Sequence, residues 1–245
     1  MDRGKLTLAL DIGGTGLKAG VLDAKGNLVA PHARVETPPH GTPDQVLEAL
    51  IGLVQLLGAF DRISVGFPGV VRRGHVLTAP NLGTENWRDY PLASALTDRL
   101  GKPVRMLNDA TVHGLGVIKG AGVECVITLG TGFGFALFDH GGLTPHLELA
   151  HHPIRTGKDY DQYIGEAALE TIGRKRWNRR LTRALACVRD LTFYDALYIG
   201  GGNARHIRLT LDDNMHVVPN DAGITGGVRL WDPRLDADFA AENHG

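Results

Sequence analysis

The chain has 245 residues, 43% of them hydrophobic, which is enough apolar material for a sizeable core in one large domain or two small ones. The formal net charge of -1 gives no argument for a nucleic-acid or membrane partner. There is no long apolar segment near the N-terminus, so neither export nor membrane anchoring is indicated. The 33 glycines are well above the average usage of about 7% and stand mostly in short turns, which favours an α/β protein with many tight connections.

In chain order, the hydrophobic pattern first predicts three strands, then a helix and a fourth strand. The strands are expected at 5–11, 18–23, 27–36 and 63–67, with the helix at 42–60. A second helix is expected at 92–100, followed by a short strand at 104–107 and a helix that runs through Gly116. Asn108 and Asp109 lie where this last strand passes into its helix.

The same order of elements begins again at Cys125. A strand, a Gly/Thr turn and a second strand are followed by a turn at 140–142, a third segment from Leu143, a helix at 161–191 and a strand at 197–199. The repeat is one of architecture and not of residues, so it predicts two β-β-β-α-β lobes with a ligand cleft beyond the strand ends. We place the N-terminal lobe at 1–107 and the C-terminal lobe at 108–245.

Two glycine-rich turns are the strongest candidates for a binding site. D-I-G-G-T-G-L-K (11–18) and L-G-T-G-F-G (129–134) each stand between two apolar runs, which is typical of a β-hairpin with a Gly/Thr tip. Glycines permit positive φ and let backbone N–H groups approach an anion, and threonine adds a hydroxyl donor. Neither spacing matches a P-loop or a dinucleotide motif. The expected phosphate ligands are Gly13, Gly14, Thr15, Gly130, Thr131 and Gly132.

Charged residues accompany the first of these turns. Asp11 ends the first strand beside the turn, so it is a candidate ligand for a divalent cation, directly or through water, or else a turn-forming residue with a local backbone bond. Lys18 is either a phosphate ligand or a solvated strand lysine. Cys125 and Cys187 have no metal or redox spacing, which predicts free thiols in a reducing cytoplasm.

Five motifs, in order and spacing, resemble those of ROK-family sugar kinases, most closely their polyphosphate-glucokinase branch. They are the two glycine-rich turns, L-N-D-A (107–110), E-L-A-H (148–151) and I-G-G-G-N (199–203). The resemblance covers residues 5 to about 230. It implies an actin-like/ribonuclease-H-like two-lobed α/β fold with a central cleft, phosphoryl transfer to a sugar hydroxyl, and a homodimer.

The resemblance also implies that Asp109 is the catalytic base. A carboxylate at a strand end can accept the proton of the attacking hydroxyl. The residues alone leave open that Asn108-Asp109 merely caps the next helix. Residues at the positions that bind sugar hydroxyls in the family are Asn81, Asn108, Glu148 and His151.

The sequence departs from the family after Glu148. The family motif is E-x-G-H followed by a cysteine cluster that completes a zinc site, whereas this chain has Ala150, two histidines, and no cysteine between 126 and 186. Zinc needs about four N, S or O ligands. We therefore predict no structural zinc, as the polyphosphate-glucokinase branch also implies.

The helix that contains residues 173–180 is strongly basic. Its apolar stripe is Trp177, Leu181, Leu185 and Val188, and its basic side is Arg174, Arg176, Arg180 and Arg183. The basic side is a solvated face, a track for a polyanion, or, least favoured, a nucleic-acid surface. In the family, the turn at 199–203 lies where adenosine binds. The candidates for nucleotide or polyphosphate contacts are Gly200, Gly201, Gly202, Asn203, Arg176 and Arg180.

The leading prediction is a cytoplasmic sugar kinase that uses polyphosphate or ATP, with Mg²⁺ near Asp11, to convert a hexose, most often glucose, to its 6-phosphate. Its partners are small molecules, without nucleic acid or membrane. An actin- or chaperone-like ATPase is disfavoured because Asn81, Glu148 and His151 would have no role. An inactive sugar- or phosphate-sensing relative is the other alternative, and the altered E-L-A-H-H segment is the only hint of it.

Overall fold

A computed structural model describes residues 4–219 and 222–240. The chain divides into two compact units, the first made of Met1–Gly116 with Asp221–Gly245 and the second of Val117–Asn220. The predicted boundary at residue 107 therefore differs from the observed one. The helix that starts at Asp109 belongs to the first unit, and the C-terminal part of the chain returns to that unit.

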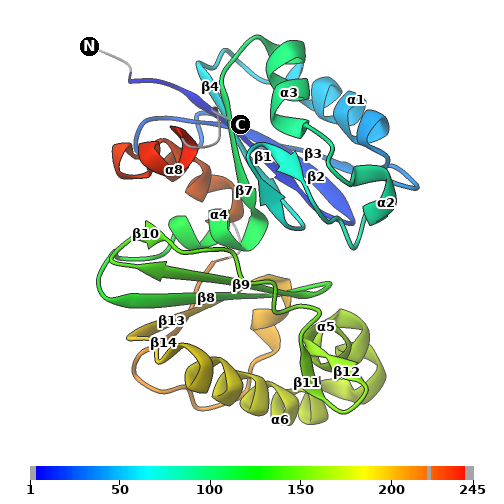
Figure 1. Cartoon of the computed structure of the whole chain (residues 1–245), viewed down its shortest axis with the longest axis vertical. Helices are drawn as coiled ribbons and strands as arrows, with labels where there is room; N and C mark the ends of the chain where they lie inside the picture. The colour runs from blue at the N-terminus through cyan, green and yellow to red at the C-terminus, as the bar shows by residue number, and fades with distance from the viewer. Residues whose placement is uncertain (1–3, 220–221, 241–245) are drawn as a thin grey trace. The chain divides into compact units, whose positions relative to one another are not determined.

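The first unit is built on a five-stranded mixed sheet with the order β3-β2-β1-β4-β7 (Figure 1). Its strands are β1 (Thr7–Ile12), β2 (Gly16–Leu22), β3 (Ala33–Glu36), β4 (Arg62–Phe67) and β7 (Val104–Asn108). β1, β2 and β3 are antiparallel, whereas β1, β4 and β7 run parallel. The carboxyl ends of the three parallel strands therefore meet at one edge.

Helices cover both faces of this sheet. On one face lie α1 (Pro43–Val54) and α3 (Leu92–Leu100), and on the other lie α4 (Asp109–Leu115), α7 (Ala222–Thr225) and the 3₁₀ helix η2 (Gly226–Trp231). β1 shows the strand alternation directly, because Leu8 and Leu10 join the core under α1 while Ala9 packs with Ile224 of α7. The smaller elements are β5 (Val71–Arg72), β6 (His75–Val76), α2 (Thr84–Trp87), η3 (Pro233–Leu235) and α8 (Asp236–Ala240).

The second unit repeats this plan with the order β10-β9-β8-β13-β14. Its main strands are β8 (Val123–Leu129), β9 (Phe133–Asp139), β10 (Gly142–Leu143), β13 (Ala196–Gly200) and β14 (Met215–Val217). The first three are antiparallel, and β8, β13 and β14 are parallel. The other elements are the hairpin β11 (Pro153–Arg155) and β12 (Lys158–Asp159), α5 (Tyr160–Ile164), α6 (Glu166–Thr192) and the 3₁₀ helix η1 (Gly202–His206).

The helix α6 packs its apolar stripe against this second sheet, as predicted. Trp177, Leu181 and Val188 are fully buried, together with Cys125 and Ile127 of β8. A kink interrupts α6 at Gly173, whose φ of 72° and ψ of 162° form a conformation that is essentially restricted to glycine.

Three predicted elements differ from the observed ones. The helix expected at 42–60 starts at its N-cap Thr42 but ends at Val54, and the strand expected at 27–36 is reduced to β3. The single helix expected at 161–191 is α5 plus α6, because the chain leaves the helical conformation at Gly165. Of the helices within residues 4–219 and 222–240, each is too short or too polar to span a bilayer.

Candidate active site

The carboxyl ends of β1, β4 and β7 bring the predicted acidic residues of the first unit to one edge. In the parallel ladders Asp11 stands opposite Gly66, and Gly66 stands opposite Leu107. Asn108 and Asp109 follow at the end of β7. Ligands of α/β sheets bind beyond this end of the strands.

Asn108 is the N-cap of α4. Its Oδ1 accepts hydrogen bonds from the N–H groups of Ala110 and Thr111 at 3.0 and 3.3 Å, and its Nδ2 donates to the carbonyl of Gly69 at 3.2 Å. With 8% of its surface exposed, this side chain is committed to positioning the start of the helix. Its predicted contact with a sugar hydroxyl stays a prediction.

Asp109 is the first residue of α4, and one of its carboxylate oxygens accepts from the N–H of Ala110 at 2.8 Å. Asn108 provides the N-cap, and the Asp109 carboxylate adds one hydrogen bond to the same first turn. Gly66 of β4 lies next to it, since a Cβ on Gly66 would be in ordinary van der Waals contact with the Cα of Asp109, at 3.5 Å. The position suits a carboxylate that reaches the strand edge.

The first glycine-rich turn, which we call tip 1 (Gly13, Gly14 and Thr15), is a tight connection between β1 and β2. The N–H of Gly13 donates to the carbonyl of Gly16 at 3.0 Å, and Thr15 is exposed. A Cβ on Gly14 would lie only 2.9 Å from the Cβ of Asn81. The expected phosphate tip and the expected sugar residue Asn81 are therefore in direct contact.

Asp11 and Lys18 face each other across this hairpin. The Lys18 Nζ lies 2.9 Å from the Asp11 Oδ2, and the two side chains are 27% and 19% exposed. A Cβ on Gly223 of α7 would lie 3.6 Å from the same oxygen. This ion pair gives each residue a partner within the protein, so the predicted roles of Lys18 toward phosphate and of Asp11 toward magnesium stay predictions.

The second glycine-rich turn, tip 2 (Gly130, Thr131 and Gly132), is supported by helix termini. The carbonyl of Gly130 accepts from the Asn203 Nδ2 at 3.1 Å and from the N–H of Glu166 at 3.0 Å. The motif at 199–203 and tip 2 thus form one local structure, with Thr131 exposed. Gly201, with φ of 86°, lies against Leu129.

The glycines of the two tips do not use the positive φ that glycine permits. Among the described glycines, Gly13, Gly14, Gly130 and Gly132 are not in the left-handed region. At three of them a larger residue would not fit, because another atom lies too close to the glycine. A Cβ on Gly13 would lie 2.9 Å from the carbonyl oxygen of Gly16, and a Cβ on Gly132 would lie 2.8 Å from the carboxylate of Asp161. The third is Gly14, whose Cβ would lie 2.9 Å from the Cβ of Asn81. Gly130 has open space where its Cβ would be.

Sequence reasoning missed Asp161, which supports tip 2. Its Oδ1 accepts from the N–H of Phe133 at 2.6 Å, and burial raises the pKa of its carboxyl above the usual value. The available signal was an acidic residue at the start of the helix predicted at 161–191.

Glu148 and His151 lie on one turn of the second unit. Burial disfavours the charged form of Glu148, but His146 at 3.3 Å, the N–H of Ala150 at 3.2 Å and the charge of His151 together hold its pKa below the usual value. The Nδ1 of His151 lies 3.8 Å from the Oδ2 of Asp159 and its side chain is 51% exposed. An ionised Glu148 is a hydrogen-bond acceptor suited to a hydroxyl. Sequence reasoning missed His146, for which the motif offered no signal.

The basic side of α6 has two different parts. The guanidinium of Arg180 donates to the carbonyl of Tyr163 at 3.0 Å and lies 4.9 Å from the centre of its ring, while Arg183 reaches the carbonyl of Ile154 at 3.4 Å. Arg180 therefore holds α6 to α5. Arg176 is exposed, and its predicted phosphate role stays a prediction.

Metal ligands are not clustered in the described parts of the chain. No three His, Cys, Asp or Glu side chains of residues 4–219 and 222–240 are arranged to hold an ion. The predicted lack of structural zinc and the predicted magnesium both stay predictions.

Each unit thus has three antiparallel strands that continue into two parallel ones, with a glycine-rich tip between the first two strands. This is the actin-like class of α/β fold that the sequence predicted. A solved structure of the same class is the inorganic polyphosphate/ATP-glucomannokinase from Arthrobacter sp. strain KM, with a TM-score of 0.83 and 32% identity, covering 98% of this chain and 100% of that one.

The family model described as "ROK family" matches residues 7–144, and the chain belongs to the ROK family. Curated relatives agree. A polyphosphate glucokinase of Mycobacterium tuberculosis (strain CDC 1551 / Oshkosh) is 31% identical over 236 residues, 89% of this chain and 88% of that protein. A glucokinase of Streptomyces coelicolor (strain ATCC BAA-471 / A3(2) / M145) is 38% identical over 206 residues, 73% of this chain and 62% of that protein.

Proposed function

We propose that the chain is a sugar kinase that transfers a phosphoryl group from inorganic polyphosphate or ATP to a hexose hydroxyl, with glucose to glucose 6-phosphate as the first candidate reaction. The observation that carries the proposal is Asp109, which stands at the carboxyl end of β7 while its neighbour Asn108 supplies the helix cap. The names of the similar proteins support the reaction class and both donors.

In this reaction Asp109 accepts the proton of the attacking hydroxyl and holds the oxygen in line with the phosphorus. Asn81, Glu148 and His151 orient the sugar through its other hydroxyls. The backbone N–H groups and hydroxyls of tip 1 and tip 2 bind the phosphates of one donor. Phosphoryl transfer depends mostly on such positioning and on charge stabilisation.

Magnesium fits the residues of the first unit only as an ion shared with the donor. Mg²⁺ usually binds through one or two carboxylates, with water and substrate phosphates completing its shell. Asp11 offers one carboxylate at the strand edge beside tip 1, with Lys18 bound to one of its oxygens. Bound there, the ion would neutralise charge on the donor phosphates, and Lys18 would keep Asp11 oriented.

Three further parts of the proposal concern the setting of the enzyme. We place it in the cytoplasm, as the free thiols of Cys125 and Cys187 support. Its ligands are a sugar and a phosphate donor, without nucleic acid or membrane. It works as a homodimer, which size measurement in solution tests.

The test is a panel of hexoses offered with ATP or with inorganic polyphosphate, in which the phosphorylated product is identified by ³¹P NMR. The expected result is a hexose 6-phosphate whose formation requires both sugar and donor. Steady hydrolysis of ATP that no sugar changes would identify an ATPase instead. Sugar binding without product from either donor would identify a sensor.

A further inference from the structure

The second unit carries a group of arginines whose role the proposed active site leaves open. Arg174 follows the kink in α6, and Arg205 and Arg208 lie in and just after η1. All three are exposed. We call them the basic cluster.

A buried asparagine joins the two segments that carry the cluster. Asn178, one turn after Arg174 on α6, is 7% exposed. Its Nδ2 donates to the carbonyls of Arg174 and His206 at 2.9 and 3.0 Å, and its Oδ1 accepts from the N–H of Arg208 at 2.7 Å. The arginines are therefore held on one surface by a satisfied, buried polar group.

Positive charge in the cluster is not balanced by neighbouring acids. Within residues 4–219 and 222–240, none of the three arginines forms an ion pair with a carboxylate, whereas Arg189 on the same helix pairs with Asp212 at 3.4 Å. Slight burial and then the charges of Arg174, Arg205 and Arg208 lower the pKa of the His206 imidazole. Like charges held together cost stability, so an anion that binds them is stabilising.

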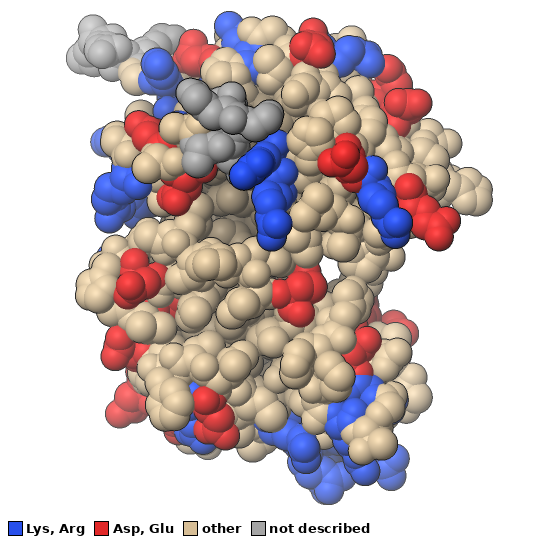
Figure 2. Space-filling model, viewed as in Figure 1, with Lys and Arg blue, Asp and Glu red and all other residues tan. Residues whose placement is uncertain are grey.

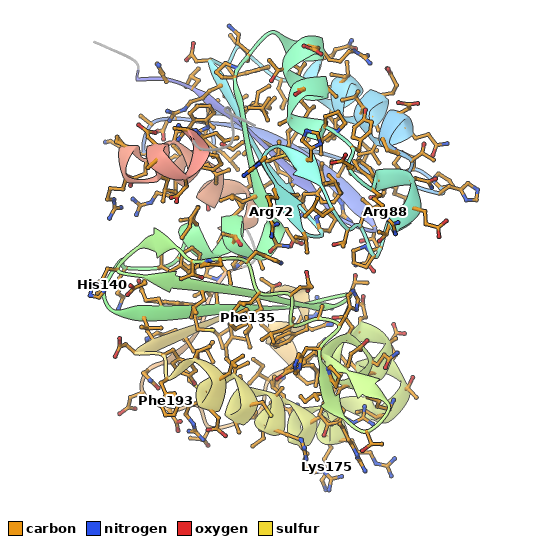
Figure 3. All side chains as sticks on the ribbon, in the orientation of Figure 1. Arg72, Arg88, Phe135, His140, Lys175 and Phe193 are labelled. Carbon is orange, nitrogen blue, oxygen red and sulfur yellow. The ribbon has the colours of Figure 1, made fainter. Side chains whose placement is uncertain are left out.

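Figure 2 shows Lys and Arg side chains gathered at the lower edge of the second unit in this view. Figure 3 labels Lys175, the neighbour of Arg174, at that lower edge beside α6. Arg176 and Arg179 on the same helix are also exposed. The cluster thus lies in a broader basic surface of the second unit.

The 3₁₀ helix η1 links tip 2 to the cluster. Asn203, in η1, donates to the carbonyl of Gly130, and η1 ends at His206 beside the arginines. A 3₁₀ helix rises about 2 Å per residue, so the five residues of η1 span on the order of 10 Å. A ligand that begins at tip 2 and stays anionic over that length reaches the cluster.

We propose that the basic cluster of Arg174, Arg205 and Arg208 binds the distal phosphates of an inorganic polyphosphate chain whose end lies at tip 2. The inference rests on the proposed function, since it assigns tip 2 to a phosphate donor. Inorganic polyphosphate is the ligand that fits, because every residue of the chain carries charge, whereas ATP becomes uncharged beyond its three phosphates. Guanidinium groups bind such oxygens by paired, charge-assisted hydrogen bonds.

The experiment measures binding of long-chain polyphosphate and of tripolyphosphate to the full-length protein by calorimetry, at one fixed ionic strength because salt screens charge. The test variant carries R174Q, R205Q and R208Q. The control carries K119Q, R155Q and K158Q, which remove the same charge from exposed positions of the same unit away from α6 and η1. We expect the test variant to bind the long chain at least about tenfold more weakly, with tripolyphosphate affinity unchanged, and the control to stay within about threefold of wild type.

A second readout reports on the site itself. In wild-type protein, long-chain polyphosphate raises the pKa of His206, followed by NMR, because bound phosphates offset the charges of Arg174, Arg205 and Arg208 that lower it. Tripolyphosphate leaves that pKa unchanged. Both variants must first show wild-type circular dichroism, and the His206 titration of the wild type does not depend on how the variants fold.

Several results would overturn the proposal. They are equal affinity of wild type and test variant for the long chain, an equal loss in the control, an unmoved His206, or tighter binding of single-stranded nucleic acid than of polyphosphate at the same ionic strength. Kinase activity is scored separately. Polyphosphate binding through the cluster without any sugar phosphate product would contradict the proposed function and leave the docking site supported.

Discussion

Tip 1 and tip 2 have nearly the same sequence pattern but are supported in different ways. Tip 1 packs against the turn that carries Asn81, a residue expected to contact the sugar. Tip 2 is held by the start of α6, by Asp161 and by Asn203, all within the second unit. Tip 1 therefore packs directly against one expected sugar residue. Tip 2 is joined through Asp161 to the turn of Glu148 and His151, and through Asn203 to the 3₁₀ helix next to the basic cluster. We infer that tip 1 affects sugar binding by direct contact, whereas tip 2 affects it only through Asp161.

The largest expected effect is a loss of turnover without a loss of substrate binding. Asp109→Asn keeps the size of the side chain and an acceptor oxygen for Ala110 but removes the base, so turnover should fall by about 10² to 10⁴. The KM values for sugar and donor should change little. Steady-state kinetics with each donor measures this, and Asp98→Asn, at an exposed position of α3, is the matched control. Full turnover in Asp109→Asn would remove Asp109 from the mechanism.

Alanine at single glycines tests the two tips separately. Gly14→Ala forces a Cβ to within 2.9 Å of Asn81, and Gly132→Ala forces one to within 2.8 Å of the Asp161 carboxylate. Displacements of this kind cost about tenfold or more in KM or turnover. We expect Gly14→Ala to raise the KM for sugar and donor alike, and Gly132→Ala to raise the KM for the donor more than that for the sugar.

Gly52→Ala, in α1 and outside both tips, is the control for both variants, since its Cβ would meet nothing within 4 Å. Unfolding temperatures show whether each protein is intact. If Gly132→Ala raised the KM for sugar as much as Gly14→Ala does, the difference in support between the tips would have no functional meaning.

Much of this architecture could be predicted from the sequence because it depends on local patterns. Alternating apolar runs and glycine-rich turns indicate the two hairpins, and helical periodicity indicates the buried stripe of α6. The return of α7 and η2 to the first unit could not be predicted, because the hydrogen bond from Ser64 to the carbonyl of Gly227 joins residues that are far apart in the chain. The pairing of Asp11 with Lys18 could have been predicted, since a two-strand hairpin places them opposite each other.

Within the site, the sequence predicts which residues carry the chemistry, but it does not predict the contacts that hold those residues in place. The motifs indicate Glu148 and His151, but the contact of Glu148 with His146 depends on how one turn folds. The sequence also predicts a single basic face on the helix. In the structure Arg180 and Arg183 bind backbone carbonyls of other elements, whereas the charge of Arg174, with those of Arg205 and Arg208 from another segment, lowers the pKa of His206.

A smaller effect concerns the acid limit of sugar binding in the second unit. The pKa of Glu148 is below its usual value, so its carboxylate and any stability it contributes are present above the unfolded-state pKa and are lost as pH falls through the lowered one. His146→Ala removes the contact that offsets burial, so this pKa should rise. As pH falls, the KM for sugar should begin to rise at a higher pH in His146→Ala than in wild type. His152→Ala, next to the same turn, is the control, and an unchanged acid limit would exclude the coupling.

The smallest effect is on the stability of tip 2. Because burial raises the pKa of Asp161, its contribution to stability is fully present below the unfolded-state pKa and is lost as pH rises through the raised value. Asp161→Asn keeps an acceptor for Phe133 without the charge, so the melting temperature at neutral pH should rise by about 1 to 3 °C. The gain should vanish in acid. A variant less stable than wild type at neutral pH would mean that the charge itself stabilises the tip.

The most direct test of the account is a crystal structure of the protein with glucose and a non-hydrolysable ATP analogue. We predict a sugar hydroxyl within hydrogen-bond distance of the Asp109 carboxylate, Asn81 and Glu148 on other hydroxyls, and the donor phosphates on the backbone of both tips. Glucose bound away from Asp109, or phosphates that touch neither Gly13–Thr15 nor Gly130–Gly132, would contradict the account.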